Sequence, residues 1–283
     1  MDIFDPSELR KLYIPDNNSQ GEDNGQITII GGSHLFHGAP LLSLKAASRI
    51  VDMVFFASPE PSLGEIANAL KSQLSSFIWV PMEEIEHYIA KSDAVLIGPG
   101  FMRFNSEKID HGLRQEECDE ACQRSKSLTE NLLEKFLNKK WVIDAGSLQT
   151  MEATRIPKNA VLTPNTKEFT QLFGDNITPQ EAAKKYECTV VVKNKITHVC
   201  SPTQCVEVHG GNAGMTKGGT GDVQAGLTVG LLAKNDPFLA ASAASYLVKK
   251  AADKLFEKKG AMYNADDLAD QIPIVFSART AVK

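Results

Sequence analysis

Short apolar runs alternate with segments in which apolar residues recur at helical spacing. The apolar runs lie at 27–30, 53–57, 77–80 and 94–98, and helical segments follow the first three at 38–51, 63–71 and 83–90. Apolar runs without polar interruption are typical of parallel strands that are covered on both faces. The first third of the chain therefore predicts a parallel sheet with crossover helices.

The alternation continues in the second half of the chain and then gives way to helices. It predicts strands at 141–144, 160–162 and 189–193, with helices at 127–138, 166–173 and 178–186. Two short runs, 197–200 and 205–208, flank a turn and predict a hairpin. Helices at 221–234, 237–258 and 265–270 complete an α/β fold with a mostly parallel central sheet, helices on both faces and one short antiparallel hairpin.

Two segments interrupt this pattern. Residues 1–25 are polar and are interpreted as a leader with a short helix at 6–12. Residues 101–126 are charged, contain two cysteines and lack a strong apolar period, which indicates an insertion or a solvated helix pair on the rim. No internal repeat or linker divides the remainder, so one catalytic domain over 26–283 is predicted.

Composition narrows the class of protein. The 283 residues carry a net charge of −5 and no basic stripe, which argues against nucleic acid as a partner. No apolar run approaches the length that crosses a bilayer, and the acidic, polar N-terminus is unlike a signal peptide. A cytoplasmic protein is the default expectation, with no membrane partner.

The five cysteines are few and odd in number. Cys118 and Cys122 have helical spacing near His111, but no second pair completes a metal set, so a metal site there is disfavoured. Cys200 and Cys205 could face each other across the hairpin. Reduced thiols are nevertheless expected in the cytosol.

A glycine-rich segment carries the clearest chemistry. Gly214–Asp222 holds four glycines and runs directly into a helical pattern. Unpaired amides and the positive end of a helix dipole form an anion-binding site, which a phosphate fits. An acid at this point suits a base that takes a proton from a substrate hydroxyl while phosphate is transferred. The alternative is that Asp222 is only a helix N-cap.

Familiar phosphate motifs do not describe this segment. Gly214 to Gly219 has the spacing of a Walker loop, but Thr220 stands where lysine is required. Gln224 replaces the third glycine of a dinucleotide fingerprint.

Four further turns directly follow predicted strands, where ligands of open parallel sheets bind. These turns are Gly31–Ser33, Gly98–Gly100, Asp144–Gly146 and Thr163–Asn165.

Together these segments resemble one family, the ADP/ATP-dependent NAD(P)H-hydrate dehydratases of the ribokinase-like superfamily. The resemblance runs from about Ile29 to Lys234. The matching segments are GGSHLFHGAPLLSLKAA (31–47), DAVLIGPGF (93–101), VIDAGSLQ (142–149), AVLTPNTKEF (160–169), VVVKNKIT (190–197) and GNAGMTKGGTGDVQAGL (211–227).

The resemblance implies a three-layer α/β/α sandwich that repairs damaged nicotinamide cofactors. Hydrated NADH or NADPH would be phosphorylated on its C6 hydroxyl by ADP or ATP, and loss of phosphate would restore the ring double bond. Mg²⁺ would bridge the nucleotide phosphates. The resemblance also implies a homo-oligomer.

The resemblance assigns roles to individual residues. Asp222 would be the base. The anion hole would be Gly218, Gly219, Thr220 and Gly221. The hydrated cofactor would contact Ala39, Gly100, Asn165 and Asp222. The adenine nucleotide would contact Lys193, Asn194, Lys195, Ile196, Thr197, Asn212, Gly214, Met215, Thr216, Lys217 and Gly221. Glu168 falls where superfamily members carry an acid near the metal, but it could equally be an exposed acid in the first turn of a helix.

The chain departs from the family pattern at a few positions. Asn165 stands where the family usually has histidine, and Asn194 where it favours glycine. Lys217 adds a positive charge before the glycines, which suits nucleotide binding or a solvated lysine equally. Two alternative functions remain open. One is a superfamily kinase of a thiazole or pyrimidine alcohol, which keeps the phosphate on its product, and the other is a nucleotide-binding relative without catalysis.

Overall fold

The computed structural model describes residues 1–103 and 118–277. A ten-stranded sheet runs through the molecule in the order β1-β10-β9-β8-β7-β6-β5-β2-β3-β4. Its strands are β1 (Asp2–Ile3), β2 (Gln26–Ile30), β3 (Met53–Ala57), β4 (Ile78–Trp79), β5 (Ala94–Ile97), β6 (Lys140–Ile143), β7 (Val161–Leu162), β8 (Thr189–Val192), β9 (Thr197–Cys200) and β10 (Cys205–Val208). Only β9 runs antiparallel to its neighbours, so the predicted α/β fold with a mostly parallel sheet and a hairpin is confirmed.

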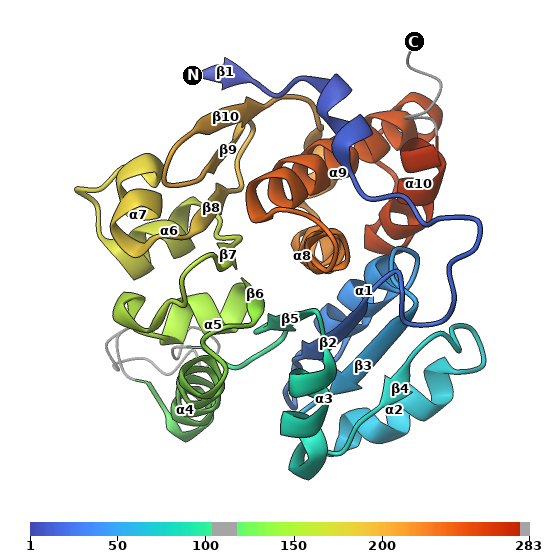
Figure 1. The fold of residues 1–283 in the computed structure, drawn as a ribbon, viewed down its shortest axis with the longest axis vertical. Helices are drawn as coiled ribbons and strands as arrows, with labels where there is room; N and C mark the ends of the chain where they lie inside the picture. Colours follow the sequence, from blue (N-terminus) through green and yellow to red (C-terminus); the bar gives the residue numbers. More distant parts are fainter. Residues whose placement is uncertain (104–117, 278–283) are drawn as a thin grey trace.

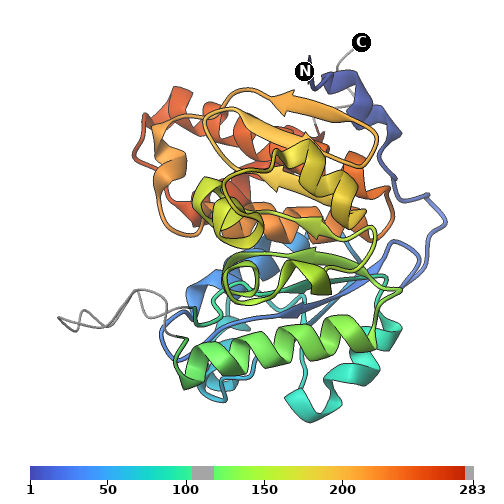
Figure 2. The same cartoon turned by 90° about the vertical axis from the view of Figure 1, so that its left-hand side faces the viewer.

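Helices cover both faces of the sheet (Figures 1 and 2). One face carries α1 (Gly38–Ala47), α2 (Ser62–Leu70), α8 (Thr220–Leu232), α9 (Pro237–Lys259) and α10 (Ala265–Ser277). The other carries α3 (Ile85–Lys91), α4 (Glu120–Lys135), α5 (Ala145–Thr150), α6 (Thr166–Phe173) and α7 (Pro179–Tyr186). Short 3₁₀ segments lie at Pro6–Lys11, Met82–Glu84, Ala153–Arg155 and Ala213–Thr216.

The strands supply side chains to two separate cores. In β5, Ala94 and Leu96 join one apolar cluster while Val95 and Ile97 join the other, because successive side chains of a strand point to opposite faces. Both clusters are buried, which explains the uninterrupted apolar runs in the sequence. The three layers follow directly from this two-sided burial.

Helix α8 lies against the sheet between α1 and α9 (Figure 1). It is apolar on all sides, as a helix in the interior of a protein is. Gly226 allows α1 to approach closely, since a Cβ atom there would lie 2.2 Å from the carbonyl oxygen of Ser43. The Ser43 hydroxyl also donates to the main-chain oxygen of Asp222 at 2.8 Å. These contacts fix the N-terminus of α8.

Several elements differ from those expected. Asp2–Ile3 pairs with β10, and Phe4, Leu9 and Leu12 are buried, so the polar leader contributes to both sheet and core. Most side chains of residues 1–25 are polar, so the sequence pattern does not reveal that these three apolar ones are buried. Helix α4 begins at Glu120, inside the segment expected as a rim insertion, and residues 104–117 of that segment lie outside the described residues.

The cysteines also differ from expectation. The prediction of reduced thiols is wrong for Cys200 and Cys205, which form a disulfide, and Cys118 and Cys122 form a second one. The hairpin register places Cys205 directly opposite Cys200, so the pairing follows from the strand geometry. Among the described residues, no cluster of three histidines, cysteines or acids could hold a metal ion. Within the same ranges, no helix has the length and apolar character needed to cross a membrane.

The close approach of α1 and α8 predicts a large effect of one methyl group. We expect Gly226→Ala to lower the free energy of unfolding by about 1–3 kcal/mol, because the added carbon overlaps the backbone of α1. Urea denaturation followed by circular dichroism measures the change. Gly21→Ala is the matched control, since its added carbon meets no atom within 4 Å. Equal stability of the two variants would contradict this account of the helix contact.

Candidate active site

The carboxyl ends of the strands meet at one edge of the sheet, and the order of the strands changes direction there. Strand β2 lies between β5 and β3. From β2, the sheet continues through β3 to β4 on one side and through β5, β6 and β7 to β8 on the other. Ligands of open parallel sheets bind beside such a switch point. The two loops that leave β2 and β5 are joined there by a hydrogen bond from the Gly32 amide to the Pro99 oxygen at 2.8 Å.

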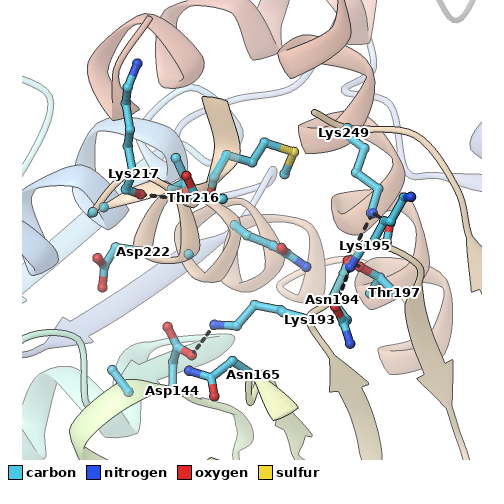
Figure 3. A pocket seen from close by; sticks show the side chains of 18 of the residues that line it. Asp144, Asn165, Lys193, Asn194, Lys195, Thr197, Thr216, Lys217, Asp222 and Lys249 are labelled. Atoms are coloured by element: carbon cyan, nitrogen blue, oxygen red, sulfur yellow. Dashed lines mark hydrogen bonds and ion pairs between the residues drawn. The ribbon is translucent and has the colours of Figure 1, made fainter. Parts of the chain in front are cut away.

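A cavity of about 850 Å³ opens along this edge toward β8 (Figure 3). Its walls come from the residues that follow β6, β7 and β8, from the loop between β10 and α8, and from the first turn of α8. Arg103, beyond the end of β5, also lines the cavity and lies over the ring of Phe36 in the loop after β2. The cavity is therefore adjacent to the paired loops at the switch point.

The glycine-rich segment turns sharply into α8. Gly219 has a φ of 91°, and a Cβ atom there would lie 2.3 Å from Leu42, so only glycine fits. The Thr220 hydroxyl donates to the oxygens of Met215 at 2.7 Å and Lys217 at 3.0 Å, which holds the turn closed. No side chain among the described residues caps α8. Its N-terminus thus faces the cavity as a site suited to an anion.

Asp222 lies in the first turn of α8 and faces the cavity (Figure 3). Burial and the negative charge of Asp144 raise the pKa of Asp222 to about 7, although the positive charge of Lys193 opposes this shift. A carboxyl group with this pKa can accept and release a proton near neutral pH. Its place at a helix N-terminus combines a base with an anion-binding site.

Lys193 reaches into the cavity from the end of β8. Its Nζ atom forms an ion pair with Asp144 at 2.9 Å, and the Thr163 hydroxyl donates to the same carboxylate oxygen at 2.8 Å. Burial acts to lower the pKa of Lys193, but the charges of Asp144 and Glu168 outweigh it, and the net effect is a raised pKa. Lys193 therefore stays positively charged among three acidic residues, Asp144, Glu168 and Asp222.

Asn165 and Glu168 form a capping box at the start of α6. The Glu168 amide donates to Asn165 Oδ1 at 3.0 Å, and the Asn165 amide donates to Glu168 Oε2 at 2.8 Å. Gln149 Nε2 donates to the other carboxylate oxygen at 2.9 Å. Glu168 is buried rather than exposed in its helix, unlike the solvated acid that the sequence left open. It is held close to Lys193 by the cap.

Lys217 is directed away from the cavity (Figure 3). Its Nζ atom donates to the main-chain oxygens of Ala261 and Tyr263. The Lys217 ammonium group therefore holds the chain before α10 in place and does not point toward the proposed phosphate site. Asn212 closes the same loop by accepting hydrogen bonds from the Gly214 amide at 3.0 Å and the Tyr263 hydroxyl at 2.8 Å.

The structure brings most of the predicted site residues together. The cavity is lined by Asn165, Glu168, Lys193, Asn194, Lys195, Thr197, Asn212, Met215, Thr216, Lys217, Gly218, Gly219, Thr220, Gly221 and Asp222. Four predicted residues lie off its wall, namely Ala39, Gly100, Ile196 and Gly214. Gly100 packs against the loop after β2, where a Cβ atom would lie 2.5 Å from the Phe36 oxygen. Gly214 is pressed against the ring of Tyr263, and Ile196 is exposed.

Sequence reasoning missed three charged residues of the cavity wall. Asp144 directly follows a buried strand, and this position is the signal that could have identified it as a site acid, since the sequence alone shows it only as part of a turn. Arg103 and Lys249 also line the cavity. Nothing in the sequence separates Lys249 from its neighbour Lys250, because only the orientation of α9 decides which of them faces inward.

A protein-family model described as NAD(P)H-hydrate dehydratase matches residues 27–274. The chain belongs to this family. It is 32% identical over 270 residues to the bifunctional NAD(P)H-hydrate repair enzyme of Methanocaldococcus jannaschii, covering 95% of this chain and 51% of that protein. It is 29% identical over 282 residues to the ADP-dependent (S)-NAD(P)H-hydrate dehydratase of Nitrosopumilus maritimus, covering 94% of each. The chain thus spans about half the length of the bifunctional relatives.

Among solved structures, the fold is similar to that of the ADP/ATP-dependent NAD(P)H-hydrate dehydratase of Bacillus subtilis, which was co-crystallised with ATP and Mg²⁺. The TM-score is 0.78 at 22% identity, with 98% of both chains covered. At this identity the likeness supports the fold, and the family rests on the sequence match. The fold is also similar to that of a ribokinase-like superfamily protein of Enterococcus faecalis, with a TM-score of 0.80 at 20% identity and 98% of this chain covered, which confirms the expected ribokinase-like architecture.

The raised pKa of Asp222 predicts that stability depends on pH. Between its ordinary value of 3.8 and about 7, the folded state holds a proton that the unfolded state releases, so this group's contribution to stability falls as pH rises through that range. We expect Asp222→Asn to be about 1–3 kcal/mol more stable than the wild type at pH 8. The difference should shrink as the pH falls and should vanish only below 3.8, where Asp222 is protonated in both the folded and the unfolded state. A constant difference across pH, measured by denaturant unfolding, would refute the shifted pKa.

The capping role of Asn165 predicts the effect of restoring the usual family residue. We expect Asn165→His to keep activity but to lose about 1 kcal/mol of stability, because histidine is a poorer N-cap. Thermal unfolding measures the loss. Thr178→His is the control at an equivalent capping box remote from the cavity, and it should be destabilised to a similar degree with unchanged activity. Loss of activity in Asn165→His alone would show that the family pocket is built differently in this chain.

Proposed function

We propose that this protein dehydrates hydrated NADH or NADPH back to the intact cofactor, with ADP or ATP as the phosphoryl donor. One observation carries the proposal: a carboxyl group of raised pKa, Asp222, lies at the uncapped N-terminus of a helix beside a lysine. Membership in the NAD(P)H-hydrate dehydratase family supports the choice of substrate.

Asp222 acts as the base in this mechanism. It takes the proton of the C6 hydroxyl while the hydroxyl oxygen attacks the terminal phosphorus of the nucleotide, and the shortened nucleotide leaves. The pKa of about 7 means that a large share of Asp222 is ionised at neutral pH while remaining basic enough to accept a proton. The burial that raises the pKa of Asp222 therefore makes it a stronger base for this step.

The start of α8 stabilises the transferred group. The amides of Gly218, Gly219, Thr220 and Gly221 form the proposed anion hole, and the helix dipole adds to their field. A Cβ atom on Gly218 would meet no atom within 4 Å, so this part of the loop is open to a ligand. Lys193 supplies a positive charge beside this helix start, since its Nζ atom would lie 3.3 Å from a Cβ atom on Gly221.

Elimination completes the reaction. The C6–O bond breaks with loss of inorganic phosphate, and a proton leaves the neighbouring ring carbon, so that the ring double bond returns. Phosphate is a much better leaving group than hydroxide at neutral pH, which accounts for the use of a nucleotide. Over both steps, water is removed from the substrate and one phosphoanhydride bond is hydrolysed.

The two substrates would occupy adjacent regions. The hydrated cofactor would extend from Asp222 toward Asn165 and the loops that contain Ala39 and Gly100. The adenine nucleotide would lie along residues 193–197 and 212–217, including Ile196, whose exposed side chain is available to a flat ring. Arg103 lines the cavity and lies over the ring of Phe36, in the loop that leads to Ala39.

The acids near Lys193 suit Mg²⁺ that arrives with the nucleotide. Asp144 and Glu168 offer oxygen ligands of the kind that Mg²⁺ prefers, but the described residues form no three-ligand cluster that would bind the ion alone. Mg²⁺ would neutralise phosphate charge and orient the phosphates during transfer. The acids would contact it directly or through water.

The family resemblance also supports a homo-oligomer. The long helix 237–258, which the sequence left free to cover the sheet or to join a neighbour, packs within the chain against α8, α10 and the strands β8 and β9. Any contact between copies would therefore use the exposed residues of this helix, such as Phe256, or other surfaces.

The repair reaction predicts a direct optical signal. Purified protein mixed with hydrated NADH, Mg²⁺ and ADP or ATP should restore the near-ultraviolet absorbance of the reduced nicotinamide ring. The donor is identified by running the two nucleotides separately. A flat trace with both, from protein that binds them, would reject the dehydratase and favour a kinase of small alcohols, which a phosphorylation screen would then test.

Asp222→Asn should bind nucleotide like the wild type but turn over about 10²–10⁴-fold more slowly, because the amide cannot accept the proton. The wild-type kcat/KM should rise with pH up to about 7 and then level, as the base ionises. Undiminished turnover in the variant would remove the assignment of the base.

A further inference from the structure

Two loops contribute to the wall of the cavity, residues 193–197 and 210–217. Figure 3 shows the first loop on the right, beside Lys249, and the end of the second loop at Thr216 and Lys217 on the upper left. They are connected by the β9–β10 hairpin and leave it at its open end, where Thr197 pairs with Val208. Beyond that pair the hairpin ladder ends. Something else must set the separation of the loops.

Lys249 spans the gap between them. It is on α9, only 5% exposed, and its Nζ atom donates to the main-chain oxygens of Lys195 at 2.8 Å, Gly210 at 3.0 Å and Asn194 at 3.3 Å. A lysine ammonium has three donors, so all of its hydrogen-bonding capacity is used on the two loops. A single side chain thus fastens one loop to the other.

Asp253 continues the arrangement one turn later on α9. Its carboxylate accepts hydrogen bonds from the Gly211 amide at 3.2 Å and from Asn212 Nδ2 at 3.3 Å. Gly210 and Gly211 have φ values of 101° and 80°, so this part of the loop follows a path that other residues rarely adopt. Lys249 therefore holds both loops and Asp253 holds the second loop, so this part of the cavity wall is fixed to α9.

Burial of a charged lysine costs desolvation free energy, so this arrangement is a poor way to stabilise a fold. Burial lowers the pKa of Lys249, and its direct acceptors are neutral carbonyls rather than a carboxylate. An apolar side chain of similar size would often serve stability equally well at a buried position. A buried ammonium that ties together two ligand-facing loops is better explained by the geometry it maintains.

We propose that Lys249 and Asp253 form a clamp that presets the spacing of the two nucleotide-binding loops. Both are positioning residues that act on the adenine nucleotide through the backbone at 194–195 and 210–212. The inference rests on the proposed function, which assigns this wall to the nucleotide. Loops that are already spaced for the ligand lose less conformational freedom on binding, and affinity rises accordingly.

The test compares Lys249→Met with Lys250→Met, which changes the exposed neighbouring lysine on the same helix. We expect Lys249→Met to raise the nucleotide KM, and the nucleotide Kd by calorimetry, about 10-fold or more, because small displacements of binding groups are costly. The kcat at saturating nucleotide and the KM for the hydrated cofactor should stay near wild-type values. Lys250→Met should match the wild type in every respect.

Lys249→Gln separates positioning from folding. The amide can still donate to the carbonyls but carries no charge, so nucleotide affinity should recover partly toward wild type. If Lys249→Met does not fold, Lys249→Gln and Asp253→Asn carry the test, each with a raised nucleotide KM and an unchanged kcat expected. A lower melting temperature with an unchanged nucleotide KM in these variants would overturn the clamp and leave a structural role only.

The wild type distinguishes failure of the clamp from failure of the proposed function. Wild-type protein that binds neither ADP nor ATP would overturn both. Wild-type protein that binds nucleotide and turns over, together with a Lys249→Met variant of equal nucleotide KM, would overturn the clamp alone.

Discussion

The site depends on the position of one buried helix. Helix α8 is apolar on all sides, and α1, α9 and the sheet enclose it, so its N-terminus cannot move without disturbing the core. Gly226 and the Ser43 hydrogen bond fix its distance from α1. Because Asp222 and the glycine turn lie at the start of this helix, the rigidity of the core fixes the position of the proposed base and anion hole.

Charge is distributed unevenly around that helix end. Asp144, Glu168 and Asp222 share the single positive charge of Lys193, and the carboxyl that gains least from it is Asp222. Asp144 has the ion pair, and Glu168 has the helix cap and Gln149. The raised pKa of Asp222 thus means that the protein accepts a loss of stability at the position of the proposed base.

The sequence predicted most of the fold because two-sided burial gives each central strand an unbroken apolar run. It also predicted Asp222, since an acid in a glycine-rich turn is chemically unusual. It failed where the deciding fact is the direction of a side chain. Lys217 and Lys249 are both lysines near the cavity, yet one faces away and the other joins two loops. The role of Asn165 as a helix cap was likewise hidden, because a capping box and a substrate contact use the same residue types.

The first and last strands of the sheet are both unusually short. β1 and β4 contain two residues each, and they occupy the two edges. Long unpaired edges invite strands of other molecules to add on, and short ones offer them almost no ladder of hydrogen bonds. The sheet is therefore protected against growth from copy to copy into fibres, even though its interior strands are among the most apolar segments of the chain.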